Sequence, residues 1–175
     1  GASIALGTGA IGLEMCEQMP DFDALLVPVG GGGLIGGIAN AVKQLRQDVE
    51  IIGIEPEGAD SMHRSFASGK PESIDEVRSI ADSLGAPYAL PYSFGLTQAN
   101  VDRLVLVSDL QMRQAMGHLF LSMRIAVEPA CAASTAALLG PLRESLRGRK
   151  VLLVMCGSNI DWATFSRQVV FDDAD

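Results

Sequence analysis

The sequence predicts an α/β fold, with three layers, a mostly parallel sheet and helices on both faces. Apolar runs alternate with helical patterns along the 175 residues. Each run is continuously apolar, which is typical of parallel strands that are covered on both sides. Hydrophobic residues make up 48% of the chain and charged residues 19%, a composition that supports one substantial core. We therefore expect a single α/β domain over residues 1–175.

Four apolar runs are predicted to be strands: Ala24–Val29, Glu50–Ile54, Leu104–Val107 and Lys150–Met155. Helical spacing of apolar residues, with capping residues or proline at the ends, predicts the helices. They are expected over Thr8–Met19, Leu34–Gln47, Ala59–Ala67, Ser93–Asn100, Asp109–Arg124, Pro129–Leu139 and Asp161–Val170. Turn formers predict an irregular, functional or mobile loop from Pro71 to Pro91. The acidic end from Asp172 is expected to be frayed.

Charge and cysteine content argue against several kinds of partner. The formal net charge of −8 disfavours nucleic acid and anionic membranes. No apolar run reaches the roughly 18 residues that a membrane-spanning helix needs. Cys16, Cys131 and Cys156 lack metal-ligand spacing and fit a reducing compartment. We expect a cytoplasmic protein without nucleic-acid or membrane partners.

The segment Gly30–Gly33, here called the glycine loop, carries the strongest functional signal. It joins the predicted strand Ala24–Val29 to the helix that begins at Leu34. Glycine lets the backbone approach a ligand closely, and the free N–H groups of a helix N-terminus favour an anion. Parallel sheets bind ligands at the carboxyl ends of their strands, where this loop lies. The glycine loop therefore predicts a phosphate-bearing ligand.

The glycine loop differs from two better-known phosphate loops. No Lys-Ser or Lys-Thr pair follows it, so it is not a Walker loop. Gly31, Gly33 and Gly36 match the dinucleotide-binding fingerprint only loosely, with Glu55 as the acidic residue after the next strand. A generic nucleotide-binding domain stays open as a hypothesis, and so does a tight turn without a ligand.

Two other segments follow predicted strands. The stretch Cys156–Asn159 comes after the last strand, at the expected ligand edge, although most unpaired cysteines are small buried hydrophobes. The acidic stretch Glu55–Asp60 offers carboxylates and carbonyls that suit a hard cation. From the residues alone, a solvated acidic turn is the preferred interpretation of the second stretch.

Short motifs span nearly the whole chain: Gly7–Glu14, Val27–Leu34, Gly53–Pro56, Ser79–Asp82, Val101–Asp102, Val127–Pro129 and Cys156–Asp161. In this order and spacing they resemble the C-terminal half of the fold-type II pyridoxal-phosphate (PLP) enzymes. The resemblance is greatest to threonine and serine dehydratases (threonine ammonia-lyases) and to serine racemase. It implies part of the tryptophan synthase β-like fold.

The resemblance implies a cofactor site. Backbone N–H groups would hold the PLP phosphate at Gly30, Gly31, Gly32, Gly33 and Leu34. Cys156 would face the pyridine nitrogen. A neutral partner there would leave the nitrogen largely unprotonated, which suits β-elimination of a hydroxyl group.

The resemblance also raises the question of a metal site. In several relatives a Mg²⁺ or Ca²⁺ ion is held by groups that match Glu55 and the carbonyl of Ala59. The third ligand is usually Asp, and Ser61 stands at that position in this sequence. This departure weakens the expectation of a metal.

The family's cofactor-binding lysine lies in its N-terminal half, within a motif that this sequence lacks. The lysines here are Lys43, Lys70 and Lys150, and none has that context. The resemblance implies the PLP-binding portion of a lyase that converts threonine or serine to a 2-oxo acid and ammonia. We expect the chain to be inactive alone. In the complete enzyme we expect an amino-acid substrate, and a homodimer or a partner chain that supplies the N-terminal half.

Two alternatives stay open at this stage. The chain could be a non-catalytic protein that binds PLP or another phosphate ligand, or it could be half of a two-chain enzyme. The family's loop for the substrate carboxylate is absent from this sequence. The residues therefore do not choose between threonine and serine, or between elimination and racemisation.

Overall fold

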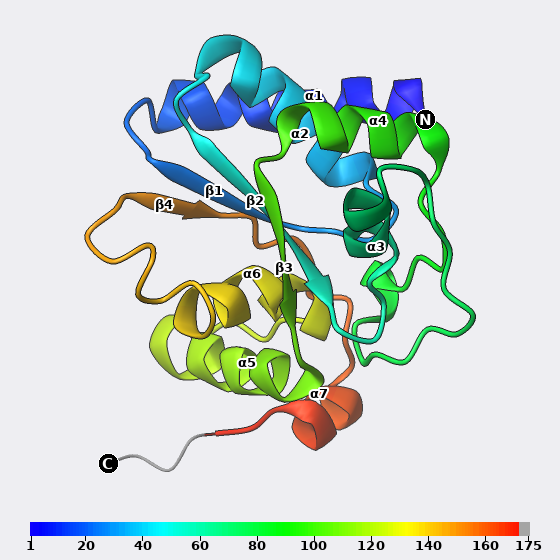
Figure 1. Cartoon of the computed structure of the whole chain (residues 1–175). Coiled ribbons are helices and arrows are strands. Elements are labelled where there is room, and N and C mark those ends of the chain that lie inside the picture. Colours follow the sequence, from blue (N-terminus) through cyan, green and yellow to red (C-terminus); the bar gives the residue numbers. More distant parts are fainter. Residues whose placement is uncertain (172–175) are drawn as a thin grey trace.

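A computed structural model describes residues 1–171, and the predicted frayed end from Asp172 lies outside the described residues. Figure 1 shows the arrangement of the elements along the chain. The helices are α1 (Ala2–Gln18), α2 (Gly33–Leu45), α3 (Ser61–Ser68), the 3₁₀ turn η1 (Asp82–Leu84), α4 (Pro91–Asn100), α5 (Asp109–Met123), α6 (Pro129–Leu139) and α7 (Trp162–Gln168). The strands are β1 (Ala24–Pro28), β2 (Glu50–Pro56), β3 (Arg103–Val107) and β4 (Val151–Leu153).

The four strands form one parallel sheet in the order β3-β2-β1-β4. Leu26 of β1 lies opposite Ile52 of β2 on one side and Leu153 of β4 on the other. Because all four strands run in the same direction, their carboxyl ends meet at one edge of the sheet. The glycine loop and Cys156 follow β1 and β4 at this edge, as the sequence predicts.

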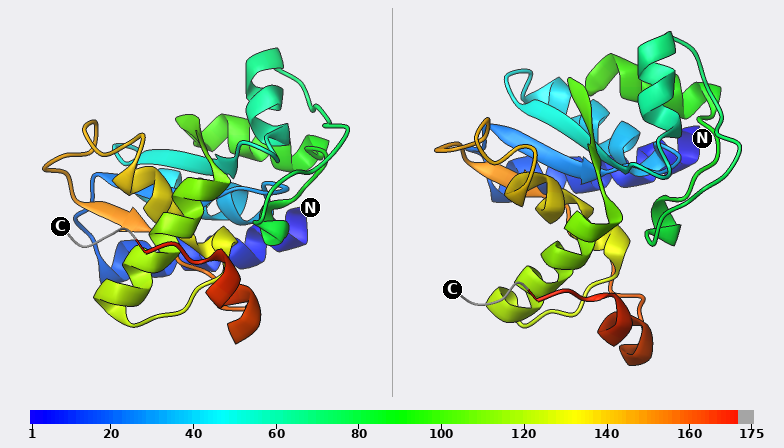
Figure 2. Two further views of the ribbon diagram at one scale, coloured as in Figure 1. Left: turned by 90° about the horizontal axis from the view of Figure 1, so that it is seen from below. Right: turned by 60° about the horizontal axis from the view of Figure 1, so that its bottom comes forward.

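Helices cover both faces of the sheet, which confirms the predicted three-layer α/β fold. Helices α1, α2 and α4 lie on one side, and α5 and α6 lie on the other (Figures 1 and 2). Alternate residues of β1 enter opposite cores: Leu25 and Val27 belong to the core cluster that includes Ile38 of α2, whereas Leu26 belongs to the cluster that includes Met112 of α5. Burial on both faces explains why the strand runs are continuously apolar.

Helix α1 begins at Ala2, six residues before the predicted start at Thr8. Tertiary packing explains the extension, because α1 lies very close to α2. A Cβ atom on Gly37 of α2 would lie 2.3 Å from the carbonyl oxygen of Ala5, so this close approach requires glycine. The Thr8 hydroxyl donates to the carbonyl of Gly33 at 3.0 Å. Packing therefore outweighs the low helix propensity of the glycines in α1.

The last strand is shorter than predicted, because β4 ends at Leu153 rather than Met155. It lies at the edge of the sheet and pairs only with β1. The N–H of Val154 still donates to the carbonyl of Leu26 at 2.9 Å, after which the chain leaves the sheet. The departure carries Cys156 out to the edge where the glycine loop lies.

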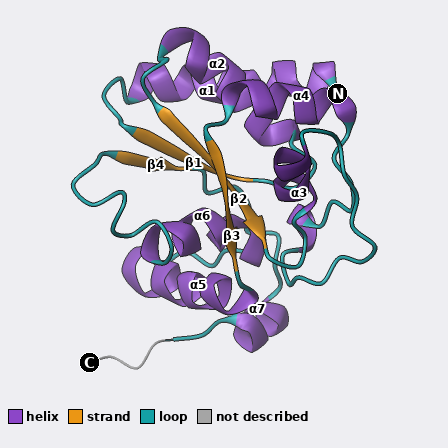
Figure 3. Ribbon diagram, in the orientation of Figure 1, coloured by secondary structure: helices purple, strands orange, loops and turns teal. Residues whose placement is uncertain are grey.

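The predicted irregular loop is indeed irregular apart from η1, and Figure 3 shows it as a long teal segment beside α3. Polar contacts tie it to the segments that follow β2 and β3. The N–H of Arg78 donates to the carbonyl of Gly58 at 2.8 Å, and the Ser79 hydroxyl donates to Asp109 at 2.8 Å. These ties bring η1 back over the carboxyl end of β1.

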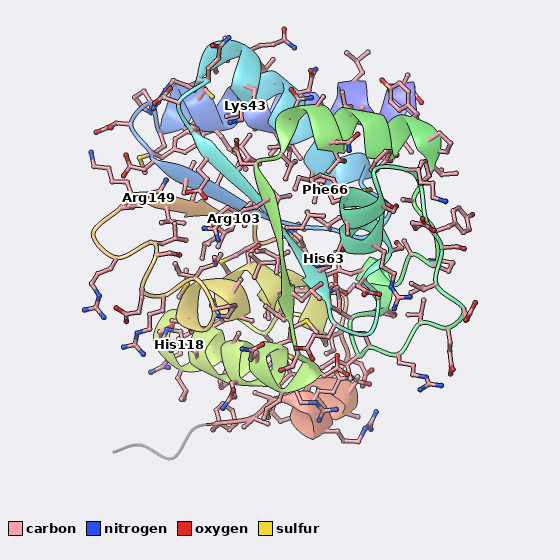
Figure 4. The ribbon with its side chains drawn as sticks, in the orientation of Figure 1. Lys43, His63, Phe66, Arg103, His118 and Arg149 are labelled. Carbon is pink, nitrogen blue, oxygen red and sulfur yellow. The ribbon has the colours of Figure 1, made fainter. Side chains whose placement is uncertain are left out.

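The opposite end of the sheet carries charged contacts. Glu50, the first residue of β2, accepts from Nε of Arg103 at 2.8 Å and forms a second ion pair with Arg149. Figure 4 labels both arginines beside the sheet. No helix within residues 1–171 is long and apolar enough to cross a membrane.

Candidate functional site

A cavity of about 230 Å³ lies at the carboxyl ends of β1 and β4. Its wall includes the glycine loop, Leu34, Leu84, Ser83, Glu128 and Cys156. All six residues predicted to contact the cofactor therefore lie around one cavity, although the glycine loop and Cys156 are far apart in the sequence. The cavity is the point where two strand ends, η1 and the start of α6 converge.

The backbone of the glycine loop is held tightly from behind. Gly32 is the N-cap residue of α2 and has a φ of 79°, which favours glycine. A Cβ on Gly32 would lie 2.6 Å from Cε of Met62, and one on Gly30 would lie 3.1 Å from Cα of Leu84. A Cβ on Gly31 would meet only Cβ of Ala86, at 3.9 Å. Glycine is thus favoured at position 32 by its φ and at position 30 by the close backbone of Leu84, whereas position 31 has space for a methyl group.

The N–H groups of this loop are open to a ligand. In the hydrogen bonds of the described residues, no N–H from residues 30–35 donates to another group of the chain. The first bond of α2 runs from the N–H of Gly36 to the carbonyl of Gly32 at 3.0 Å. No side chain caps the helix. The start of α2 therefore offers several donors and the positive end of a helix dipole to an anion.

Cys156 is an exposed residue on the cavity wall, not the small buried hydrophobe that an unpaired cysteine usually is. Partial desolvation of its thiol, followed by the nearby charge of Glu128, raises the pKa of Cys156 above its ordinary value. The thiol is consequently uncharged at neutral pH. An uncharged thiol can act as a weak hydrogen-bond donor toward a ring nitrogen.

Glu128 brings a carboxyl group into the same wall and is only 8% exposed. Burial raises the pKa of Glu128, the charge of Asp82 raises it further, and the Ser83 side chain lowers it. A Cβ on Gly157 would lie 2.2 Å from Oε1 of Glu128, so the carboxyl group lies directly against the turn after Cys156. The sequence indicates the motif around Glu128 but assigns no role to the residue.

Glu55 is wholly buried, so the interpretation of its segment as a solvated turn is wrong for this residue. Its two carboxylate oxygens accept the N–H groups of Met62 at 2.9 Å and His63 at 2.7 Å. The side chain thus caps the N-terminus of α3 from within the core. Burial raises the pKa of Glu55 to about 8, although the two N–H donors act in the opposite direction.

The metal site suggested at Glu55 and Ala59 is not supported. Both carboxylate oxygens of Glu55 already accept N–H groups, and the Ser61 hydroxyl donates to the carbonyl of Ala86 at 2.9 Å. Residues 1–171 contain no group of three histidine, cysteine, aspartate or glutamate side chains placed to hold a metal. The burial of Glu55 against α3 also removes it as the exposed acidic residue that binds ribose in dinucleotide sites.

None of the three lysines lines the cavity. Lys43 donates to the carbonyl of Val49 at 2.8 Å and pairs with Asp102 at 2.9 Å, near the far end of α2 (Figure 4). Lys70 lies 3.6 Å from Glu72, and Lys150 pairs with Asp21. The cavity therefore contains an anion-binding end and a thiol but no amine nucleophile from this chain.

Sequence reasoning missed Ser83 and Leu84 as parts of the cavity wall. The motif that it used there ends at Asp82, one residue earlier. The length of the irregular segment, which predicts a functional loop, was the one signal that pointed to them. Their position depends on long-range contacts, such as that of Leu84 with Gly30, which no local pattern indicates.

Comparison with known proteins agrees with this geometry. The model of a family described as pyridoxal-phosphate dependent enzyme matches residues 2–157. The chain belongs to this family. That membership confirms the family resemblance seen in the motifs of the sequence.

Curated relatives of this PLP-family chain include dehydratases and ammonia-lyases. Phenylserine dehydratase from Ralstonia pickettii is 50% identical over 169 residues, which cover 97% of this chain and 52% of that protein. L-threonine ammonia-lyase from Thermotoga maritima is 35% identical over 158 residues, covering 90% of this chain and 39% of that protein. The chain thus spans about half the length of the curated relatives it matches.

Solved structures of the family have the same fold as this chain. The processed form of threonine deaminase isoform 2 from Solanum lycopersicum has a TM-score of 0.88 and 30% identity, covering 93% of this chain and 48% of that one. Maize serine racemase has a TM-score of 0.87 and 32% identity, covering 93% of this chain and 52% of that one. This chain therefore has the fold found in half of each of these larger proteins.

Proposed function

We propose that this chain forms the PLP-binding part of a lyase that converts a β-hydroxy amino acid to a 2-oxo acid and ammonia. The observation that carries the proposal is the cavity in which the open N-terminus of α2 and the Cys156 thiol meet. An anion binder and a neutral hydrogen-bonding group in one cavity match the two polar ends of PLP. Membership of the PLP family supports the choice of this ligand.

The glycine loop would bind the phosphate group. Its unpaired N–H groups, from residues 30–35, give several hydrogen bonds to one anion without any basic side chain. The tight packing behind Gly30 and Gly32 fixes these donors before the ligand arrives. A rigid loop loses little conformational freedom on binding, which favours affinity.

The other end of the cavity would contact the ring. Cys156 would face the ring nitrogen as an uncharged thiol, and Leu34 and Leu84 would contribute apolar surface to the wall. PLP, when bound, supplies an electron sink for the substrate's α-carbon. A thiol partner does not donate a full proton to the nitrogen, and this favours a short elimination over a long-lived carbanion.

A second segment must complete the site, because no lysine of this chain lies in the cavity. Covalent attachment through lysine is a general feature of PLP catalysis. We infer that an N-terminal half, in the same polypeptide or in a partner chain, provides the lysine and the substrate-carboxylate contacts. The 175 residues alone should therefore show no turnover, since covalent catalysis and substrate positioning are absent together.

The names of the relatives support a β-hydroxy amino acid as the substrate class. The matched proteins are named for phenylserine, threonine and threo-3-hydroxyaspartate, which all carry a hydroxyl group on the β-carbon. In the proposed reaction, the α-proton and the β-hydroxyl leave as water, and hydrolysis of the resulting enamine gives the 2-oxo acid and ammonia. The water lost in the elimination is taken up again in the hydrolysis, so the amino acid is converted to the 2-oxo acid and ammonia without net loss of water.

Complementation tests this proposal. The chain is co-expressed with the N-terminal half of the Ralstonia phenylserine dehydratase, PLP is added, and 2-oxo acid formation is measured with phenylserine, threonine and serine. We expect turnover from the pair and none above free PLP from either half. Gly31→Asp in the pair serves as the matched loss-of-function control. A folded pair that binds PLP but releases no 2-oxo acid would contradict the proposed lyase function.

A further inference from the structure

The space behind Gly32 is filled by a side chain from another helix. Met62, on α3, is fully buried, and its Cε lies 2.6 Å from the place where a Cβ on Gly32 would be. The terminal methyl group of Met62 therefore occupies the place of the side chain that Gly32 lacks. Because Gly32 is the N-cap residue of α2, this contact falls on the backbone that carries the open N–H groups. Figure 4 labels His63, the next residue of α3, in this part of the molecule.

A hydrogen bond fixes the backbone end of Met62. Its own N–H donates to Oε1 of Glu55 at 2.9 Å, and both residues are fully buried. Glu55 belongs to β2, the strand next to β1. The N–H of Val29, directly before the glycine loop, donates to the carbonyl of Ile54 in β2 at 2.8 Å. Met62 is thus anchored to the sheet through its backbone, while its methyl group lies against Gly32.

The residue before Met62 makes a second link to the glycine loop. The Ser61 hydroxyl donates to the carbonyl of Ala86 at 2.9 Å. The N–H of Ala86 donates to the carbonyl of Leu84 at 2.9 Å, and the backbone of Leu84 lies against Gly30. The start of α3 therefore contacts one side of the loop directly and reaches the other side through the segment that carries Leu84.

We propose that Met62 is a positioning residue, whose side chain holds the N-cap turn of α2 in the conformation that presents its free N–H groups to a phosphate. Within residues 1–171 the N–H groups of residues 30–35 donate to no group of the chain, so none of their own hydrogen bonds fixes their direction. Their direction depends instead on packing from behind. This rests on the proposed function for the identity of the ligand, but the contact of Met62 with Gly32 is present without any ligand.

Truncation of Met62 tests the proposal through the affinity for PLP. Calorimetry on the whole chain compares the wild type with Met62→Ala and Met112→Ala. Met112 is the matched control, because it is also fully buried but belongs to the core on the other face of the sheet and does not line the cavity. We expect PLP to bind about fivefold more weakly to Met62→Ala, since a loosened loop must be ordered on binding. Met112→Ala should lose a similar amount of stability and keep the wild-type affinity.

The N–H of Gly36 reports the state of the loop without a ligand. Gly36 is buried, and its N–H makes the first hydrogen bond of α2, to the carbonyl of Gly32 at 3.0 Å. The first turn of a helix opens locally, so its exchange rate reports local rather than global stability. Hydrogen exchange followed by NMR should be about fivefold faster at Gly36 in Met62→Ala than in the wild type. The rate at Gly36 in Met112→Ala should equal the wild-type rate.

If Met62→Ala does not fold, Met62→Leu and Met112→Leu replace the two alanine variants. Leucine nearly conserves the volume but does not reach as far as the methionine methyl group, so Met62→Leu should fold and bind PLP about threefold more weakly. Wild-type affinity in the folded Met62 variant, or an equal loss of affinity in its Met112 counterpart, would overturn the proposal. If the wild type itself binds no PLP, that result counts against the proposed function. The exchange rate at Gly36 then decides the role of Met62, and an unchanged rate in the Met62 variant would overturn it.

Discussion

Two helices begin at the carboxyl ends of neighbouring strands, and the chain treats their N-termini in opposite ways. At α3, which follows β2, the buried carboxylate of Glu55 accepts the N–H groups of Met62 and His63. At α2, which follows β1, the N–H groups of residues 30–35 donate to no group within residues 1–171. One helix start is capped by a carboxyl group of the chain, and the other is left open on a cavity.

The difference separates a structurally capped helix from a ligand site. A helix N-terminus has free N–H donors and attracts negative charge wherever it occurs. At α3 the buried carboxyl group of Glu55 accepts these donors and stabilises the fold. At α2 the glycine loop excludes side chains and leaves the donors free, which is the arrangement that a ligand phosphate requires. The following experiments are designed to break one site without disturbing the other.

Glu55→Ala should give the largest loss of stability. The substitution leaves two buried N–H groups without acceptors, and we expect the free energy of unfolding to fall by about 2–4 kcal/mol. Urea unfolding at pH 7 measures the loss. Glu144→Ala is the control, because Glu144 is an exposed side chain and its loss should cost less than about 0.5 kcal/mol. A similarly small effect at Glu55 would show that the cap does not stabilise the fold.

Gly32→Ala should destabilise the chain by about 1–3 kcal/mol. Alanine is strained at a φ of 79°, and its Cβ would lie 2.6 Å from Cε of Met62. Gly31→Ala is the matched control, since its Cβ would make only an ordinary contact with Ala86 at 3.9 Å. Thermal unfolding of both variants compares the two positions. Equal losses at Gly31 and Gly32 would contradict the described conformation of the loop.

The stability of the folded chain should also depend on pH through Glu55. Its pKa of about 8 in the folded chain is above the ordinary value of 4.5. The folded state therefore binds the additional proton between these values, and the stability that Glu55 contributes falls as pH rises from about 5 to 8. Glu55→Gln cannot titrate, so its stability relative to the wild type should rise over the same range. A constant difference between the two proteins would show that Glu55 does not titrate there.

Much of the fold could be predicted from the sequence, because strong local patterns and layer packing agree. The four strands and the helix that begins at Asp109 lie close to where the sequence predicts them, apart from the end of β4. The early start of α1 could not be predicted, because it depends on contact with Gly37 of another helix. The early end of β4 follows from its place at the sheet edge, which the run of apolar residues does not reveal.

The candidate site, like the fold, could be predicted only in part. The glycine loop and Cys156 were identified because strand-end loops of a parallel sheet gather at one edge. The burial of Glu55 was missed, because an acidic stretch rich in turn formers indicates a solvated turn, and only the fold places α3 over it. The roles of Ser83 and Glu128 in the wall depend on a loop that returns from far along the chain.

Titration of PLP into the folded chain tests the central claim most directly. Calorimetry would compare the wild type, Gly31→Ala and Gly31→Asp. A Cβ atom at position 31 has space, so neither substitution should disturb the fold of the loop. The account predicts saturable binding by the wild type and by Gly31→Ala. Binding by Gly31→Asp should be at least about tenfold weaker, because its carboxylate repels the phosphate. Equal affinities for the three proteins, or no binding by the folded wild type, would contradict the assignment of the glycine loop as the phosphate site.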